Sequence, residues 1–142
     1  MCRRIPEFTL LDHTADIGIQ VRGSDVKNLF ENAAKVLVHL MVKGESLKKT
    51  LPRKISVSGE DLADLMVQWL GEILYLFEGE KEVVTSLHIE SLMPSALKAS
   101  VNTVPFDPEI HEILSEIKAV TYHQIDVAPK RDYWEAKVIF DI

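Results

Sequence analysis

The chain has 142 residues, 46% of them hydrophobic and 27% charged, which suits one globular domain with a substantial apolar core. Its net charge of −6 disfavours direct binding to a nucleic-acid backbone, and its single cysteine, Cys2, excludes a disulfide framework. No apolar run is long enough to span a membrane or to form a signal peptide, so we expect a protein of the reducing cytoplasm without a membrane partner.

The first third of the chain predicts a strand followed by a helix. Apolar and polar residues alternate over 17–22, which is the pattern of a half-buried strand. Over 26–41 the apolar residues recur at steps of three and four, which indicates a helix with one buried face. Ser24 or Asp25 can cap its first turn. Gly44 lies just beyond its end, where a left-handed residue is often required.

The next segment repeats this order of elements. The alternation over 53–59 predicts a second strand, and the broad apolar face over 62–77 predicts a second helix. Ser58 followed by Asp61 resembles a capping box with aspartate in place of glutamate. Gly79 is expected to end the helix.

The second half of the chain predicts mainly strands. They cover 82–92, 95–104, 116–127 and 132–142, whereas the prolines around 106–115 argue against a long regular element there. Two helices can cover only one face of such a sheet, so this order predicts an α+β fold. We expect a two-layer architecture, an about six-stranded mixed sheet with two helices packed on one face, and a single domain over 1–142.

Acidic groups gather near both ends of the sequence. Asp12 and Asp16 flank His13 where the first alternating strand begins. The last predicted strand ends in Asp141 and Ile142, so a side-chain carboxylate stands beside the α-carboxylate. If Asp16 meets these groups in space, three anionic oxygen donors converge, and such a cluster is unstable without a cation. Ligands that are all oxygen suit calcium, magnesium or manganese.

A purely structural interpretation of these residues stays open. Asp12 and Asp16 can cap loops, and Lys118 can pair with either carboxylate. His13 and His123 can be hydrogen-bonded polar residues near the edge of the core. The chain contains no glycine-rich phosphate loop and no CxxC, HExxH or GxSxG motif, so motifs alone indicate no site.

Five segments occur in the order and at the spacing of one known family. They are DHTADIGI (12–19), NLFENAAKVL (28–37), GEDLADLMVQWLGEILYL (59–76), EIKAVTYH (116–123) and VIFDI (138–142). Two of the motifs, His-Thr-Ala-Asp and Lys-Ala-Val-Thr-Tyr-His, are distinctive, and the similarity runs over nearly the whole chain. On these segments the sequence resembles the archease family.

The resemblance implies an accessory protein rather than an enzyme. Archease-like proteins promote the GTP-dependent guanylylation of the RtcB-type RNA ligase, which joins tRNA exon halves, so that the ligase turns over repeatedly. The implied partner is this ligase, and tRNA is reached only through it. The resemblance also implies a bound divalent cation, calcium before magnesium or manganese. The implied ligands are Asp16, Asp141 and Ile142, with Asp12, His13, Lys118 and His123 as residues around them.

Three further points follow for function. Lys118 and His123 are five residues apart on one predicted strand, so they should point to opposite faces and not act as a pair. A metal-dependent hydrolase of phosphoesters stays open because a bound cation can activate water, and so does a chaperone-like RNA-processing module. Over 101–115 the chain lacks the Gly-Glu pair that relatives often carry, so the resemblance assigns no role to this loop or to its histidine, His111.

Overall fold

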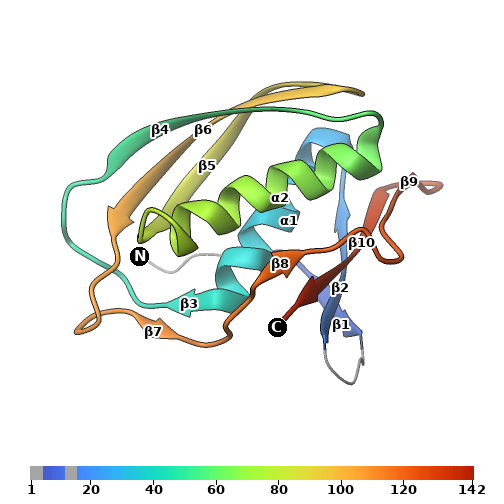
Figure 1. Ribbon diagram of the computed structural model, residues 1–142. Coiled ribbons are helices and arrows are strands. Elements are labelled where there is room, and N and C mark those ends of the chain that lie inside the picture. The colour runs from blue at the N-terminus through green and yellow to red at the C-terminus, as the bar shows by residue number, and fades with distance from the viewer. Residues whose placement is uncertain (1–4, 12–15) are drawn as a thin grey trace.

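The computed structural model describes residues 5–11 and 16–142 and has an α+β fold, as predicted (Figure 1). Its two helices are α1 (Val26–Met41) and α2 (Leu62–Glu78). Its strands are β1 (Phe8–Leu11), β2 (Asp16–Gly23), β3 (Val42–Lys43), β4 (Leu51–Ser58), β5 (Glu82–Met93), β6 (Ala96–Pro105), β7 (Glu112–Ile113), β8 (Ala119–Val120), β9 (Asp126–Pro129) and β10 (Trp134–Asp141).

Both helices begin directly after an aspartate. The Oδ1 atom of Asp25 accepts a hydrogen bond from the backbone N–H of Asn28 at 2.7 Å, which caps α1. At the start of α2, Oδ1 of Asp61 accepts from the backbone N–H of Asp64 at 2.8 Å. The predicted capping box beginning at Ser58 is therefore wrong, because Ser58 still belongs to β4 and Asp61 is itself the cap.

A glycine ends α2, as the sequence predicted, whereas α1 passes at Val42 directly into the extended backbone of β3 and is not ended by Gly44. Gly44 follows α1 and β3 with a left-handed φ of 121°, and a Cβ atom there would lie 2.4 Å from the carbonyl oxygen of Ile110. A side chain at this position is thus excluded both by backbone conformation and by space. Gly79 ends α2 and donates to the carbonyl oxygen of Tyr75 at 2.7 Å. Of the helices in the described part of the chain, neither has the length and apolar character needed to cross a membrane.

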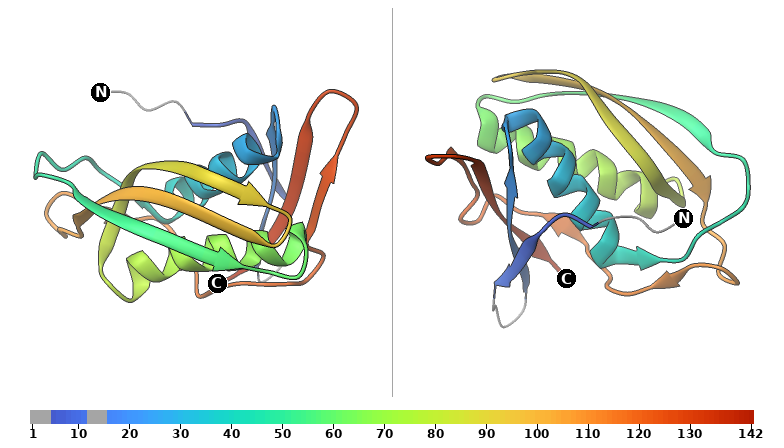
Figure 2. Two further views of the ribbon diagram at one scale, coloured as in Figure 1. Left: turned by 90° about the horizontal axis from the view of Figure 1, so that it is seen from above. Right: turned by 180° about the vertical axis from the view of Figure 1, so that it is seen from behind.

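The strands form three antiparallel sheets rather than the single mixed sheet that the sequence predicted. A five-stranded sheet has the order β1–β2–β10–β8 with β9 also paired to β10, a three-stranded sheet has the order β4–β6–β5, and β3 pairs with β7. The helices contact both larger sheets instead of packing on one face of one sheet (Figures 1 and 2). The reason lies in α2, whose nine buried residues span an arc of about 200°. One sheet face cannot cover so wide an apolar surface.

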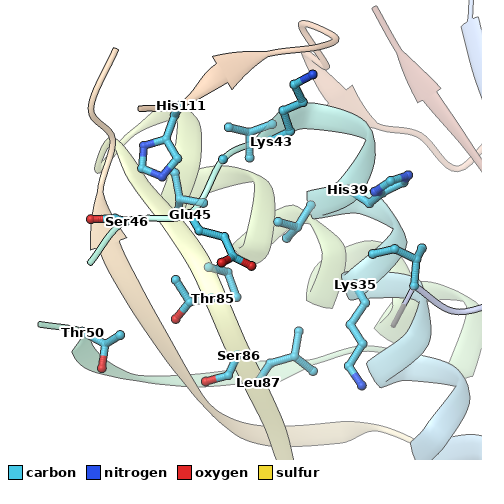
Figure 3. A pocket seen from close by; sticks show the side chains of 16 residues that line it. Lys35, His39, Lys43, Glu45, Ser46, Thr50, Thr85, Ser86, Leu87 and His111 are labelled. Atoms are coloured by element: carbon cyan, nitrogen blue, oxygen red, sulfur yellow. The ribbon is translucent and has the colours of Figure 1, made fainter. Parts of the chain in front are cut away.

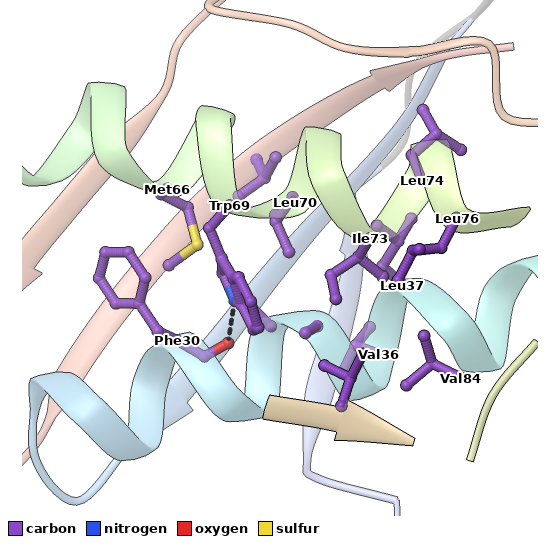
Figure 4. Close-up of a cluster of buried hydrophobic side chains, with 14 of the residues drawn as sticks. Phe30, Val36, Leu37, Met66, Trp69, Leu70, Ile73, Leu74, Leu76 and Val84 are labelled. Atoms are coloured by element: carbon purple, nitrogen blue, oxygen red, sulfur yellow. Dashed lines mark hydrogen bonds between the residues drawn. The ribbon is translucent and has the colours of Figure 1, made fainter. Parts of the chain in front are cut away.

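The main core lies where the two helices meet the sheets. Trp69 of α2 is fully buried, and its indole N–H donates to the carbonyl oxygen of Phe30 in α1 at 2.9 Å (Figure 4). Met66 and Leu70 are buried near this contact, and Leu37 is buried further along α1 beside Ile73 (Figure 4). Burying a large aromatic ring with its single donor satisfied joins the two helices at a fixed point.

The strand predicted over 116–127 is interrupted. Only the short β8 and, later, β9 pair with β10, and residues 121–125 leave the sheet between them. Gln124 in this excursion has a left-handed φ of 54°, and the hydroxyl of Tyr122 is hydrogen-bonded to α2. The left-handed φ of Gln124 does not fit a continuous strand. The irregular segment predicted over 106–115 is confirmed, apart from the two residues of β7.

Candidate metal centre

The two ends of the sequence meet in the five-stranded sheet. β10 lies between β2 and β8, and the register pairs Asp141 with Asp16 on one side and with Ala119 on the other (Figure 1). Residues directly opposite in an antiparallel pair have Cβ atoms about 5 Å apart. The structure therefore brings together the two carboxylates that the sequence analysis proposed to combine.

Asp16 and Asp141 lie on the face of the sheet that points away from the core. Side chains alternate along a strand, and their neighbours Ile17 and Phe140 pack into the hydrophobic core. Asp16 is partly exposed and Asp141 is exposed. Ile142 follows Asp141 directly and is 43% exposed, so solvent reaches this end of the sheet. An ion or a partner protein can approach it without the fold opening.

The two carboxylates have no ion-pair partner in the described part of the chain, although Lys118 is adjacent to Asp141. Among residues 5–11 and 16–142, neither Asp16 nor Asp141 forms an ion pair or a side-chain hydrogen bond. The next cationic side chain on the same face of β10 is Lys137, four residues away, or about 13 Å along the strand. Like charges directly opposite each other destabilise an antiparallel pair. A cation between the carboxylates would remove this repulsion.

The donor set at this place is small and consists of oxygen. Within the described residues, no group of three or more histidine, cysteine, aspartate and glutamate side chains is arranged to hold a metal ion. A cation beside Asp16 and Asp141 therefore needs further donors, and Ile142, the third ligand that the sequence predicted, directly follows Asp141. Oxygen donors such as these two carboxylates suit a hard divalent ion such as calcium.

Strand β8 and its flanking residues hold the end of β10 on the edge opposite β2. The backbone N–H of Lys118 donates to the carbonyl oxygen of Asp141 at 2.8 Å. Thr121 donates twice to the carbonyl oxygen of Ile139, through its backbone N–H at 3.1 Å and its hydroxyl at 2.8 Å. The position of the C-terminal segment is thus set by β2 on one edge and by residues 118–121 on the other.

Of the residues predicted to surround the site, the structure places Lys118 beside Asp141 and His123 in a separate turn. Asp12 and His13 lie outside the described residues. Lys118 is exposed next to Asp141 and borders a cavity of about 520 Å³. His123 is exposed in a turn, where its backbone N–H donates to the hydroxyl of Thr121 at 3.3 Å. The prediction that Lys118 and His123 share one strand is wrong, because β8 covers neither of them.

A polar cluster that the sequence did not predict joins residues 121–125 to α2. The hydroxyl of Tyr122 donates to Oδ1 of Asp64 at 2.7 Å and accepts from Nε2 of Gln68 at 2.9 Å. The hydrogen bond from Tyr122 holds the pKa of Asp64 below its ordinary value, and the hydrogen bond to Asp64 raises the pKa of Tyr122. Both residues lie within the five segments that carry the resemblance, but no local pattern pairs two residues that are 58 positions apart.

A larger cavity of about 750 Å³ lies between α1, β5 and the segment after β3. Figure 3 shows the side chain of Glu45 reaching into it, with His111 at one end. His111 is only 4% exposed, its Nδ1 accepts from the backbone N–H of Asp107 at 2.9 Å, and its ring stacks on Phe106. These contacts give His111 a role in packing its loop. None of the three candidate ligands lines this cavity.

Comparisons with known proteins agree on one family. The family model described as the archease protein family (MTH1598/TM1083) matches residues 8–142. The protein archease of Methanosarcina acetivorans is 34% identical over 140 residues, with 96% of each chain covered. That of Pyrococcus furiosus is 34% identical over 135 residues, covering 92% of this chain and 95% of its own.

Two solved structures share the fold. The solution structure of Methanobacterium thermoautotrophicum protein 1598 superposes with a TM-score of 0.71 at 28% identity, covering 95% of this chain and 98% of its own. The crystal structure of a Thermotoga maritima archease, described as a possible chaperone, has a TM-score of 0.63 at 21% identity, with 100% and 98% covered, and shows likeness of fold alone. From the family match and these relatives, the chain belongs to the archease family.

Proposed function

We propose that this chain is an accessory activator of an RtcB-type RNA ligase. It promotes the GTP-dependent guanylylation of the ligase, which then joins tRNA exon halves over many turnovers. The chain is not itself the enzyme, and tRNA meets it only through the ligase. Membership of the archease family supports this proposal, and the observation that carries its site is the register that sets Asp16 opposite Asp141.

The site is a divalent-cation site formed by Asp16, Asp141 and the α-carboxylate of Ile142. When bound, the cation supplies positive charge at an exposed edge of the sheet. The two aspartates hold it from adjacent strands, and Lys118 keeps the backbone of Asp141 in place through its N–H group. Neither carboxylate forms an ion pair with another described residue, so their mutual repulsion supports this assignment.

Calcium is the ion that this donor set suits best. Calcium takes six to eight oxygen ligands in flexible geometry, whereas magnesium requires a near-ideal octahedron. Three carboxylates on one exposed surface leave coordination positions for water or for groups of a partner protein. An ion of this kind can therefore face the ligase while it stays bound to this chain.

The proposed function is tested by a ligation assay with a small amount of ligase, excess RNA halves, GTP and divalent metal. With the wild-type chain, the joined product should exceed the amount of ligase many-fold. Asp16→Asn and Asp141→Asn should abolish this stimulation. Asp126→Asn is a matched control, because Asp126 is an exposed acid of the same sheet that lies opposite Lys137.

Each outcome of this assay has one meaning. Normal stimulation by both Asp16→Asn and Asp141→Asn would refute the site, and no stimulation by the wild-type chain would refute the function. Phosphoester turnover by the chain and metal without ligase would instead support the hydrolase. The α-carboxylate is tested separately by adding residues after Ile142, which should weaken calcium binding in a calorimetric titration.

A further inference from the structure

The segment between β8 and β9 is hydrogen-bonded to α2 through a tyrosine hydroxyl. Tyr122 donates to Oδ1 of Asp64 at 2.7 Å and accepts from Gln68 at 2.9 Å. Asp64 is itself fixed, because its Oδ2 accepts from the backbone N–H of Glu60 at 2.9 Å. Tyr122 is 55% exposed, so hydrogen bonding rather than burial accounts for its placement. A hydrogen bond to an ionised carboxylate is among the stronger ones in proteins.

The same segment positions the end of the chain. Thr121, the neighbour of Tyr122, donates two hydrogen bonds to the carbonyl oxygen of Ile139, and the backbone N–H of Lys118 donates to the carbonyl oxygen of Asp141. Between them, β8 contributes only two residues of pairing with β10. So short a strand has little stability of its own, and its position depends on the packing of Ile117 and Val120 against the core and on the hydrogen bonds at its ends.

We propose that Tyr122, held by Asp64, is a positioning residue for the terminal cation site. The rigid element is α2, and the link runs from Asp64 to Tyr122 and then to Thr121. From there it reaches the backbone of β10 at Ile139, two residues before Asp141. This inference rests on the proposed function, since it assumes that Asp141 and the α-carboxylate of Ile142 bind the ion.

The chain contains a matched control for this proposal. Tyr75 is also 55% exposed, and its hydroxyl donates to Oε1 of Glu80 at 3.1 Å. It lies in the last turns of α2, whereas Asp64 lies in the first turn, and within residues 5–11 and 16–142 it makes no hydrogen bond to β8. Tyr75→Phe and Tyr122→Phe therefore remove the same group from similar surroundings, and only the second removes the link to the C-terminal segment.

The test measures calcium affinity by calorimetry and amide hydrogen exchange on the full chain. Tyr122→Phe should bind calcium about threefold to tenfold more weakly than wild type, the usual effect of one hydrogen bond, with faster exchange at the amides of Lys118 and Thr121. Tyr75→Phe should change neither quantity. Asp64→Asn keeps an oxygen acceptor, so it should retain more of the affinity than Asp64→Ala.

The results separate this inference from the proposed function. Wild-type affinity in Tyr122→Phe would overturn the positioning role while leaving the cation site intact, even if exchange became faster. An equal loss in Tyr75→Phe would also overturn it, because the effect would then be general. Failure of the wild-type chain to bind calcium would refute the cation site itself, and this inference with it.

Discussion

Replacing Asp141 with asparagine should change the stability of the protein in opposite directions without and with a divalent cation. The substitution keeps the size and shape of the side chain but removes one of the two charges that face each other across β2 and β10. Without a cation, the repulsion between Asp16 and Asp141 disappears, so the variant should be slightly more stable than wild type. With calcium, the variant loses a ligand and should be less stable.

The size of both effects follows from the geometry. Two unit charges about 5 Å apart in water repel each other by about 0.8 kcal/mol, and measured cross-strand pairs fall near or below about 1 kcal/mol. For a chain of this size, that energy corresponds to a rise in Tm of about 3–4 °C. Calcium at a hundred times its Kd stabilises the wild-type protein by about 2.7 kcal/mol, or about 10 °C, and Asp141→Asn should lose most of this gain.

The measurement is thermal unfolding in chelator and in calcium, with Asp126→Asn as the control. Asp126 lies opposite Lys137 in β10, so its substitution removes an attraction and should lower Tm equally in both conditions. If Asp141→Asn lowers Tm by the same amount with and without calcium, the carboxylate has an ordinary structural role and the reasoning about the cation fails.

Three further predictions concern the fold. Trp69→Phe removes the N–H that donates to the buried carbonyl oxygen of Phe30, and should lower the free energy of unfolding in urea by about 1–3 kcal/mol. The hydrogen bond from Arg53 lowers the pKa of buried Glu82 below its unfolded value of about 4.3, so the stabilisation is present above that pH and is lost as pH falls through the folded-state pKa. Glu82→Gln should lack this loss of Tm in acid. If its Tm fell with pH as much as that of the wild-type protein, the stabilisation would not come from the Glu82 carboxylate. Gly44→Ala should lower Tm by an amount equivalent to at least about 1 kcal/mol, because the φ of Gly44 is left-handed and a Cβ would meet backbone; a neutral effect would contradict this.

Most of the candidate site could be named from the sequence, but not its geometry. The acidic groups Asp16 and Asp141 are visible at the two ends of the sequence, and their oxygen chemistry already indicated a hard cation. Whether they meet depends on the register of β2 against β10, and a shift by one residue would point one of them to the other face. The contribution of Tyr122 was not visible either, because its partner lies 58 positions away in α2.

The sequence by itself determined both helices, the glycine at the end of α2 and most of the strands. These features depend on contacts between residues close in sequence, such as the hydrogen bond from the backbone N–H of Asn28 to Asp25. The spacing of apolar residues therefore predicts them. Only the tertiary structure decided that the strands divide into three antiparallel sheets and that residues 116–127 break into two. Those outcomes depend on partners distant in sequence, above all on the wide apolar surface of α2, which no local pattern assigns to a particular sheet.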